Sequence, residues 1–517
     1  MKIIFYITLF FLATCGNDQP PKDAETPTLK IEKLSPKEFN LDFKLWAEWI
    51  DENDTNVGVV DSIYDLKFQQ LEFYNDLRLE GDGELINLAP IWFHKSIYLN
   101  GFSVETVYDY RSNKNKYGVA FYYKGILNKI TVNLKNIENS FSKGLIRVDD
   151  EALKDSLFIN LNLENITIKN NSNGGIHIRA VCNNGKVSNI KILSPLGYEN
   201  ARDEIKNSGN SYINDTTKVA FYNSGLIIGS RFFYSNNIDI KNIYIEELVI
   251  GHDATTFNNG GGKSRHTTGL MFAGNNCSLT NYRTKNVERP LYLRGNNFTV
   301  KDFEFDNSEY PASYFIVHKG KRDSIGVTNI SKGNISGLSE ALFLFSSTDS
   351  TTIKNVDVDI QPKKIAYKLN DSLVISSSRK SIMNEGIFRD EGGSILFQDM
   401  NIKTGDIIWP YYFIGMTGSG NNSLYFKNIT YSGNEINYFF SAKKFNKVEV
   451  SRLGIYGKLF SVSETKELRV NDVYPIERNG KDSIFNIVYL TNVNKFILNN
   501  NEIKTKDSIL NRIKIAL

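Results

Sequence analysis

The stretch SRHTTGLMFAGNNCSLTNYRTKNVERPLYLRGNNFTVKDFEFDN, residues 264–307, alternates two short apolar phrases. The first phrase is a small residue followed by apolar, any and apolar residues, as in Gly269–Phe272 and Pro290–Leu293. The second is apolar, any, Asn or Asp, apolar, any, apolar, as in Val300–Phe305. Each phrase has the period-two alternation of a β-strand of about four to six residues. The stretch therefore predicts short strands separated by turns.

The second phrase recurs along most of the chain, and the pair of phrases returns every ~20–30 residues, which is the period of a solenoid. An Asn that keeps its register on successive coils can stack and bond the backbone of its neighbours, which closes the corner of a coil. Asp-Ser before an apolar residue also recurs, and both side chains suit turns. Helix periodicity is nearly absent after residue 80, so a helical solenoid is not favoured. Further copies of the second phrase begin at Leu163, Val187, Ile240, Ile353, Phe397 and Phe426.

These repeats resemble the right-handed parallel β-helix of the pectate-lyase-like superfamily, from about residue 80 to the C-terminus. The resemblance implies an all-β fold, a right-handed parallel β-helix (solenoid) with a short N-terminal helical cap. Polysaccharide lyases are a major activity of the superfamily. A shared fold does not by itself supply an activity, so function must be argued from a site.

The N-terminus reads as an export signal. Met1 and Lys2 precede an apolar run, Ile3–Ala13, that is too short to span a bilayer as a helix. The run ends in Leu12–Cys15, which resembles the lipobox of bacterial lipoproteins, in which Cys15 would be lipidated and become the first mature residue. An ordinary secretory signal that happens to carry a Cys is the alternative. We expect an outer membrane lipoprotein that faces the periplasm or the cell surface and meets the membrane through its lipid anchor only.

The chain between the anchor and the solenoid predicts a tether and a cap. Residues 36–52 carry the one amphipathic helix pattern, and such a helix would cover the open hydrophobic end of a β-helix. Two polar insertions, 194–220 and 251–268, interrupt the coils, and loops of this kind commonly wall a substrate groove. The expected segments are residues 1–15 (signal peptide with lipobox), 16–35 (tether), 36–80 (N-terminal cap) and 81–517 (parallel β-helix).

The composition of the chain limits the partners and cofactors that we expect. The net charge of +3 does not argue for nucleic acid, and we expect none as a partner. The chain has no CxxC and no His/Cys metal spacing, and we expect no cofactor. With Cys15 used as an anchor, Cys182 and Cys277 remain on different coils, which favours buried free thiols over a disulfide. We expect a monomer. The 27 tyrosines and 33 phenylalanines suit both β-helix interiors and sugar-stacking grooves.

Aligning the first-phrase strands by their inward residues arranges the outward residues in columns, because successive coils lie about 4.8 Å apart. The inward pairs are Ile176/Ile178, Leu226/Ile228, Leu270/Phe272, Leu291/Leu293, Leu342/Leu344 and, as a further candidate, Tyr314/Ile316. The first outward column is then His177, Ile227, Met271, Tyr292 and Phe343. The second is Arg179, Gly229, Ala273, Arg294 and Phe345, in which two small residues leave room beside the arginines.

The columns and the residues that flank the strands predict a cationic groove. A single charged residue at an outward strand position is usually part of a solvated face, so the argument is the clustering. His266 precedes one strand, Arg289 precedes the next, and His318 follows another. The set that could line one face is His177, Arg179, Arg231, His252, Lys263, Arg265, His266, Arg289, Tyr292 and Arg294.

A cationic groove with a His or Tyr suits an anionic polysaccharide, because Arg binds a carboxylate or sulfate through two hydrogen bonds. In β-elimination, cations neutralise the uronate carboxylate, a base removes the C5 proton and an acid protonates the leaving oxygen. We expect His266 or Tyr292 to exchange protons, with Arg289 and Arg294 as clamps. The expected substrate-binding residues are His177, Arg179, Arg231, Lys263 and Arg265.

Two other readings stay open. Hydrolysis needs a carboxylate pair, and Glu304 with Asp306 is one candidate, although both lie on a second-phrase strand away from the basic cluster. Glu288 with Glu340 or Glu385 is another. The strand starts lack the Asn-Thr-Asp and Gly-Asp-Asp motifs expected of polygalacturonases, and the columns hold no set of Asp for a catalytic Ca²⁺. A glycan-binding or structural surface protein without catalysis is the third reading.

Overall fold

We describe the fold from a computed structural model of the chain. The chain divides into two compact units, residues 1–32 and 33–517, and every described residue belongs to the second. The predicted signal peptide, lipidation site, tether and helix 36–52 lie outside the described residues. The described residues are 72–73, 75–81, 84–87, 91–106, 119–140, 144–149, 157–169, 174–193, 224–229, 234–248, 268–312, 314–320, 326–339, 342–346, 350–361, 366–369, 372–375, 381–383, 393–404, 412–433, 438–456, 458–477 and 488–503.

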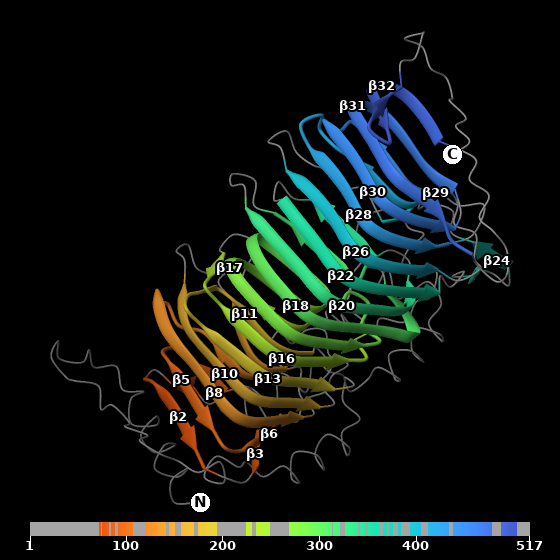
Figure 1. Ribbon diagram of the computed structural model, residues 1–517. Helices are drawn as coiled ribbons and strands as arrows, with labels where there is room; N and C mark the ends of the chain where they lie inside the picture. The colour runs from red at the N-terminus through yellow and green to blue at the C-terminus, as the bar shows by residue number, and fades with distance from the viewer. Residues whose placement is uncertain are drawn as a thin grey trace, which may run out of the picture. The chain divides into compact units, whose positions relative to one another are not determined.

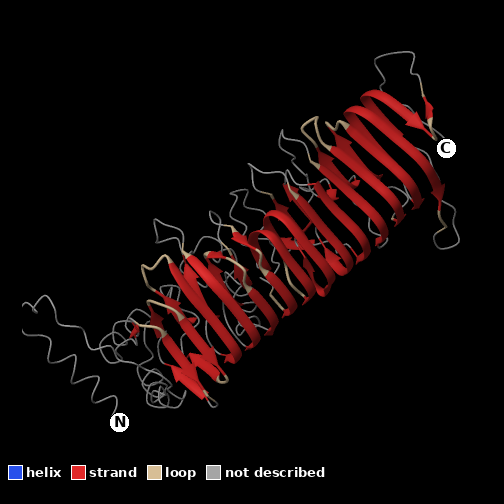
Figure 2. Ribbon diagram, turned by 60° about the vertical axis from the view of Figure 1, so that its left-hand side comes forward, coloured by secondary structure: helices blue, strands red, loops and turns tan. Residues whose placement is uncertain are grey.

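The described part of the chain is all β, and a 31-stranded hydrogen-bonded sheet holds nearly every strand. Its pairings are parallel except at the last strand, and they follow two runs, which we call the first sheet and the second sheet because they carry the first and second phrases. Figure 1 shows neighbouring strands in chain order from red to blue, and Figure 2 shows them stacked coil upon coil. The predicted parallel β-helix is confirmed.

The first sheet consists of strands β1 (Glu72–Phe73), β4 (Ile91–Phe93), β7 (Val119–Tyr123), β9 (Gly144–Asp149), β11 (Gly174–Arg179), β14 (Ser224–Ile228), β19 (Ile316–Lys319), β21 (Phe343–Ser346), β25 (Ser381–Met383), β27 (Tyr412–Thr417) and β29 (Tyr438–Lys443). The second sheet consists of β2 (Leu77–Glu80), β5 (Ile97–Asn100), β8 (Lys129–Ser140), β10 (Phe158–Lys169), β13 (Lys186–Leu193), β16 (Asp239–Glu246), β20 (Val327–Ser339), β22 (Ser350–Gln361), β26 (Ser394–Thr404), β28 (Ser423–Ser432) and β30 (Lys447–Tyr456).

Four long strands contribute to both sheets: β17 (Thr268–Lys285), β18 (Leu291–Ala312), β31 (Lys458–Pro475) and β32 (Val488–Leu498). Short strands complete the pairing. They are β3 (Glu84–Asn87), β6 (Ser103–Thr106), β12 (Val181–Cys182), β15 (Ser235–Asn236), the antiparallel hairpin of β23 (Ala366–Leu369) and β24 (Ser372–Ile375), and β33 (Asn501–Glu502), which pairs antiparallel with β32.

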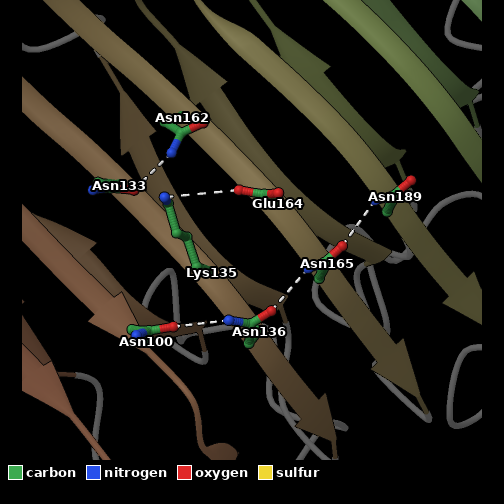
Figure 3. A network of polar contacts seen from close by, with 8 residues as sticks. All are labelled: Asn100, Asn133, Lys135, Asn136, Asn162, Glu164, Asn165 and Asn189. Carbon is green, nitrogen blue, oxygen red and sulfur yellow. Dashed lines mark hydrogen bonds and ion pairs between the residues drawn. The ribbon is translucent and has the colours of Figure 1, made fainter.

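A ladder of asparagine side chains runs along the second sheet (Figure 3). The amide nitrogen of Asn136 donates to the side-chain oxygen of Asn100 at 2.9 Å, Asn165 donates to Asn136 at 2.8 Å, and Asn189 donates to Asn165 at 2.8 Å. The ladder continues through Asn242 and Asn281. The predicted in-register Asn column is confirmed, and these amides bond one another rather than the neighbouring backbone.

The backbone explains why Asn occurs at this position. From Asn136 onward each ladder residue has a positive φ, for example 54° at Asn165 and 57° at Asn189, and Asn tolerates this left-handed conformation better than most residues. The same conformation occurs one coil after another in residues that no longer bond as amides, such as Asp302 and Lys332. Each coil therefore bends at one fixed point, and a side-chain amide stabilises the bend where it is present.

The interior of the coils is filled by apolar side chains, and many are aromatic. Phe397, Phe426, Phe440 and Phe460 are each at most 1% exposed. Their ring centres follow one another at 5.4, 4.6 and 4.9 Å, in stacked arrangements. Phe397 and Phe426 occupy the same position on neighbouring coils of the second sheet, and Phe440 and Phe460 do so on the first sheet, so the rings of each pair stack. The contact between Phe426 and Phe440 joins the two sheets across the interior. Much of the aromatic content therefore belongs to the core.

Both described cysteines are buried free thiols, as predicted. Burial raises the pKa of Cys182 to about 12, although a hydrogen bond with Ser235 opposes the shift. Burial also raises the pKa of Cys277 to about 11, against hydrogen bonds to the backbone. Both thiols are therefore protonated and unreactive at neutral pH.

Candidate functional site

The first predicted column forms as expected over four strands of the first sheet. His177 of β11 pairs with Ile227 of β14, Ile227 with Met271 of β17, and Met271 with Tyr292 of β18. In the second column, Ala273 pairs with Arg294. The inward neighbours of Tyr292 are fully buried, which leaves Tyr292 and Arg294 on the outward side of β18.

The prediction is wrong for the next two strands. Ile316 of β19 pairs with Leu291, and Phe343 of β21 pairs with Ile316, so Phe343 and Phe345 face inward and are at most 1% exposed. The column beyond Tyr292 continues as Val317 and Leu344. On β21 the difference is one residue, which turns every side chain of the strand to the other face, and the apolar run Leu342–Phe345 fits either register. On β19 the difference is two residues, which changes the partners of each side chain but not the face.

The corrected register also moves His318. It was expected just after a strand, beside the groove, but it occupies an inward position of β19 opposite Leu293 and is 0% exposed. Its Nε2 lies 3.1 Å from the backbone oxygen of Gly295, and its ring meets the edge of Phe298. His318 therefore supports the core beneath the candidate site and does not face a ligand.

Tyr292 is the centre of a cationic and aromatic cluster. The guanidinium carbon of Arg289 lies 5.6 Å from the centre of the Tyr292 ring, and the ammonium nitrogen of Lys319 lies 5.7 Å from it. Arg289 also lies 6.0 Å from the centre of the Tyr314 ring. Tyr292 packs against Tyr314 and Val317, which are largely buried. These contacts hold two cations over one half-buried phenol ring.

Arg294 extends the cluster along the same face. It pairs directly with Lys319 across β18 and β19, so the two side chains leave neighbouring strands on one side of the sheet. Among the described residues, no carboxylate forms an ion pair with Arg294 or Lys319. Two adjacent cations beside a phenol can bind a carboxylate or a sulfate, and the Tyr292 hydroxyl can exchange a proton there. We call Arg289, Tyr292, Arg294, Tyr314 and Lys319 the Tyr292 cluster.

The turn that leads into β18 fixes the position of Arg289. The backbone oxygen of Arg289 accepts a hydrogen bond from Gly269, and that of Pro290 accepts one from Leu270. The buried hydroxyl of Tyr282 also donates to Pro290, at 2.6 Å. Burial raises the pKa of Tyr282 well above its ordinary value, so this donor remains protonated. The chain is thus held on both sides of Arg289.

His177 and Arg179 lie apart from the Tyr292 cluster. Three strand pairings separate His177 from Tyr292, which is roughly 14 Å at the spacing of a parallel sheet. The Nε2 of His177 lies 2.9 Å from the backbone oxygen of Ser224, and the side chain is 7% exposed. The neighbour of His177 on the other side is Arg147. The structure therefore divides the predicted row of basic residues into two groups.

Two small residues, Gly229 and Ala273, lie between the groups, but at Gly229 the room predicted beside the arginines is filled by the neighbouring strand. Gly229 has a φ of 86°, and a Cβ on it would collide with the backbone oxygen of Ala273. Glycine is required there because the left-handed backbone and the close strand leave no space for a side chain. The other predicted groove residues, namely Arg231, His252, Lys263, Arg265 and His266, lie outside the described residues, as do Glu340 and Glu385.

The carboxylates considered for hydrolysis do not lie at the Tyr292 cluster. Glu304 faces outward on the second sheet and forms an ion pair with Arg283 of the preceding coil, at 3.6 Å between Nε and the carboxylate oxygen. Asp306, two residues on, accepts a hydrogen bond from the backbone of Ser308. Glu288 is 3% exposed. Among the described residues, no carboxylate pair therefore faces the Tyr292 cluster.

Within the described ranges, no group of three or more His, Cys, Asp or Glu residues is arranged to hold a metal ion. In the same ranges, no helix is long and apolar enough to cross a membrane.

Sequence reasoning missed several residues of the first sheet. Lys319 and Tyr314 were not assigned to the site because the register of β19 was misread. The alignment of first-phrase strands also stopped short of Trp92, Tyr122 and Arg147, although Pro90–Phe93 and Ala120–Tyr123 fit the first phrase. Alternation of apolar residues around Trp92 and Tyr122 could have extended the alignment.

No known protein-family profile and no curated protein matches this chain. Among solved structures, it is similar to the crystal structure of a hyperthermoactive exopolygalacturonase from Thermotoga maritima, with 10% identical residues and a TM-score of 0.19. The similarity covers 96% of this chain and 97% of the other. At this score the comparison carries no argument, and the fold assignment rests on the strand pairing of the chain itself.

Proposed function

We propose that this protein is an exported, lipid-anchored β-helix that binds an acidic polysaccharide at the Tyr292 cluster and cleaves it by β-elimination. The observation that carries the proposal is the placement of Arg289 and Lys319 around the Tyr292 ring, with Arg294 beside Lys319. Three cations and a phenol on one face suit a repeating uronate or sulfated sugar, because such a polymer presents one anion per unit or per pair of units.

In the proposed reaction, Arg294 and Lys319 bind the uronate carboxylate and draw negative charge away from C5. A base removes the C5 proton, the C4–O bond breaks, and the leaving oxygen takes up a proton. Tyr292 is the group of the cluster that can give or take a proton, and His266 is the second candidate. The products are a new reducing end and a sugar with a C4–C5 double bond.

Hydrolysis by a carboxylate pair is the second candidate. Glu304 and Asp306 would carry it, but they lie on the second sheet, and Glu304 is paired with Arg283. This placement favours elimination, because the cations that would bind the substrate and the carboxylates that would hydrolyse it are on different sheets. A glycan-binding protein without catalysis is the third candidate, and it would use the same cluster.

The experiment is to incubate the purified full-length protein with polygalacturonate, alginate, chondroitin sulfate and heparin. Absorbance at about 232 nm detects the double bond that only elimination creates. A rise on one substrate, lost in Arg294→Ala and strongly reduced in Tyr292→Phe, is the expected result. New reducing ends without absorbance would replace elimination by hydrolysis. Binding without an unsaturated sugar and without new reducing ends would support a glycan-binding protein that does not cleave its ligand.

The matched control is Arg283→Ala. Arg283 is also an outward arginine on a β-strand, but it lies on the second sheet, where it pairs with Glu304. We expect this variant to keep full activity. If both arginine variants lose activity equally, the effect is general and the Tyr292 cluster is not the site. His266→Ala tests the second proton-transfer candidate separately.

The proposed anchor has its own test. Cells that express the chain are labelled with radioactive palmitate, and the protein is recovered from the membrane fraction. We expect label in the wild type and none in Cys15→Ser, because the thioether at Cys15 is the attachment point. Equal labelling of the wild type and Cys15→Ser would contradict the lipoprotein assignment.

The expected monomer has a separate test. Native mass measurement of Cys15→Ser gives the mass of the assembled protein.

A further inference from the structure

The outward column that contains Tyr292 carries aromatic residues six and five strands earlier. Trp92 of β4 pairs with Tyr122 of β7, Tyr122 pairs with Arg147 of β9, and Arg147 pairs with His177 of β11. The column therefore reads Trp, Tyr, Arg, His over four successive coils. None of these residues except His177 belongs to the groove that the sequence predicts.

These side chains leave the outer side of the sheet. Their strand neighbours Ile91, Phe93, Phe121 and Ile146 are fully buried, and alternation along a strand sends every second side chain the other way. Trp92, Tyr122 and Arg147 are half-buried, which leaves part of each accessible. The first sheet thus carries a strip of aromatic and basic surface at its N-terminal end.

Lys124 adds a second cation to this strip. It directly follows β7, and its backbone nitrogen donates to the oxygen of Phe93 at 3.0 Å, which fixes the turn beside β4. Its ammonium group lies over the ring of Trp92. Trp92 and Lys124 therefore repeat, six coils before Tyr292, the combination of a ring and a cation that Tyr292 forms with Lys319.

The two places are separate on the surface. Tyr122 and Tyr292 are five strand pairings apart, or roughly 24 Å at a spacing of about 4.8 Å. Between them the column passes through Ile227, which is only 2% exposed. A ligand that touches both places must therefore be long and must run along the axis on which the coils stack.

We propose that Trp92, Tyr122, Lys124 and Arg147 form a distal subsite that binds a remote part of the same acidic polysaccharide chain. The proposal rests on the proposed function and adds that the protein prefers long polymers to short oligosaccharides. A half-buried indole or phenol packs against the apolar face of a sugar ring, and a cation beside it binds the carboxylate or sulfate of that sugar or the next. A cation lies next to each ring, with Lys124 over Trp92 and Arg147 on the strand beside Tyr122, which suits a chain whose sugars carry both a ring face and a charge.

Continuity with the Tyr292 cluster supports one ligand for both places. Both lie on the outward side of the first sheet, in the same column, and both present lysine or arginine next to an aromatic ring. Binding energy from a remote subsite can be used to hold the reacting sugar in place, so its loss lowers activity on long chains without touching the chemistry.

The experiment compares chain lengths. The full-length protein is titrated with polygalacturonate, alginate and chondroitin sulfate, each as the polymer and as a purified trisaccharide fraction. A trisaccharide is too short to reach both places. We expect Trp92→Ala and Tyr122→Ala to weaken polymer binding roughly tenfold and to leave the trisaccharide unchanged. Trp92→Phe, which keeps a ring and the core packing, should retain most of the affinity.

Tyr425→Ala is the matched control. Tyr425 is an outward tyrosine with Lys427 and Lys447 at 5.6 and 5.7 Å from its ring centre, but it belongs to the second sheet. The Tyr425→Ala variant should bind the polymer with the affinity of the wild type. Thermal unfolding of each variant excludes loss of the fold as the cause.

Each outcome separates the two proposals. If Arg294→Ala weakens polymer binding but Trp92→Ala and Tyr122→Ala do not, the distal subsite is wrong and the Tyr292 cluster stands. If Trp92→Ala weakens polymer and trisaccharide equally, the residues do not form a distal subsite. If Arg294→Ala has no effect on either ligand, the proposed function fails at its own site, whatever the Trp92 variants do.

Discussion

The ammonium nitrogen of Lys319 lies 5.7 Å from the centre of the Tyr292 ring, across the pairing of β18 with β19. Arg289, from the turn before β18, lies 5.6 Å from the same ring. Two cations from different segments therefore converge on one phenol, whose ring face attracts both. This convergence distinguishes the Tyr292 cluster from a scattered set of surface charges.

Removal of the Lys319 charge should weaken binding of an acidic polysaccharide. Lys319→Gln keeps a polar side chain, one bond shorter than that of Lys, but removes one cation beside Tyr292 and Arg294. We expect affinity for the polymer to fall about fivefold to tenfold at low salt, and the difference from wild type to shrink as salt rises, because ions screen the attraction. Isothermal titration at two salt concentrations measures both effects.

Lys301→Gln is the control for this prediction. Lys301 lies on the same strand, β18, but outward on the second sheet. Its loss changes the net charge by the same amount and should alter affinity little. Equal losses in both variants would mean that the overall charge, and not the Tyr292 cluster, attracts the polymer.

The asparagine ladder should stabilise the coils in a position-specific way. Asn165 donates to Asn136 and accepts from Asn189, and its φ is 54°. Asn165→Ala loses two hydrogen bonds of about 1 kcal/mol each and puts Ala in a conformation that costs a further ~1–2 kcal/mol. We expect a loss of about 3–4 kcal/mol in the free energy of unfolding, measured by urea denaturation.

Two further variants separate the contribution of the hydrogen bonds to this loss of stability from that of the backbone conformation. Asn165→Gly removes the hydrogen bonds but tolerates the positive φ, so it should cost less than Ala despite its greater freedom in the unfolded chain. Asn162→Ala removes the hydrogen bond to Asn133 at an ordinary backbone conformation and should cost about 1 kcal/mol. If Asn165→Gly costs more than Asn165→Ala, the backbone conformation is not the reason for Asn at this position.

The ladder shows what the sequence can predict in this fold. Asn165, Asn189 and Asn242 stand at one position of a repeated phrase, and one position per repeat means one column in a solenoid. The recurrence alone predicts the parallel coils, the strands and the ladder. A second feature of the same kind was missed. Asn-Asn recurs at Asn183, Asn236, Asn275 and Asn296, and these pairs form a further, shorter column.

The candidate site was harder to predict, and β19 shows why. Tyr314, Ile316 and His318 lie on one face of a strand, so either Tyr314 and Ile316 or Ile316 and His318 could stand opposite Leu291 and Leu293, because a His can be buried when its nitrogen is hydrogen-bonded. The structure has the second pairing, a shift of two residues that places Lys319 opposite Arg294. Local alternation predicts that a strand exists, whereas its register depends on how neighbouring coils pack.

Buried thiols should make stability depend on pH in the alkaline range. The pKa of Cys277 is raised from 9.0 to about 11 in the folded protein, so above pH 9 the unfolded chain releases a proton that the folded chain keeps. The stabilising contribution of the protonated thiol is therefore complete below about pH 9 and is lost as pH rises to about 11, by up to ~1.4 kcal/mol per pH unit.

The comparison with Cys277→Ala isolates this effect from other alkaline titrations. Free energies of unfolding of the wild type and the variant are measured from pH 8 to pH 11. We expect the difference between them to be constant near pH 8 and to shift against the wild type as pH rises. A difference that stays constant up to pH 11 would show that the thiol ionises alike in both states.

The stack of interior aromatic rings should carry much of the stability of the C-terminal coils. Phe426 is 0% exposed and lies between Phe397 at 5.4 Å and Phe440 at 4.6 Å, measured between ring centres. Phe426→Ala removes the central ring and leaves a cavity that rigid neighbouring coils cannot close, so it should cost about 3–5 kcal/mol. Phe426→Leu, which fills part of the cavity, should cost less.

Tyr425→Ala tests whether stability depends on a buried ring in the core or on any aromatic ring in β28. Tyr425 directly precedes Phe426 in β28 but faces outward, between Lys427 and Lys447, and its loss should cost less than about 1 kcal/mol. Urea denaturation and hydrogen exchange of the amides in β26, β28 and β30 measure the global and local effects. Because each coil contacts only its neighbours, Phe426→Ala should speed exchange in these strands before it affects β8 or β10. Uniform acceleration along the chain would instead mean that the solenoid unfolds as one cooperative unit.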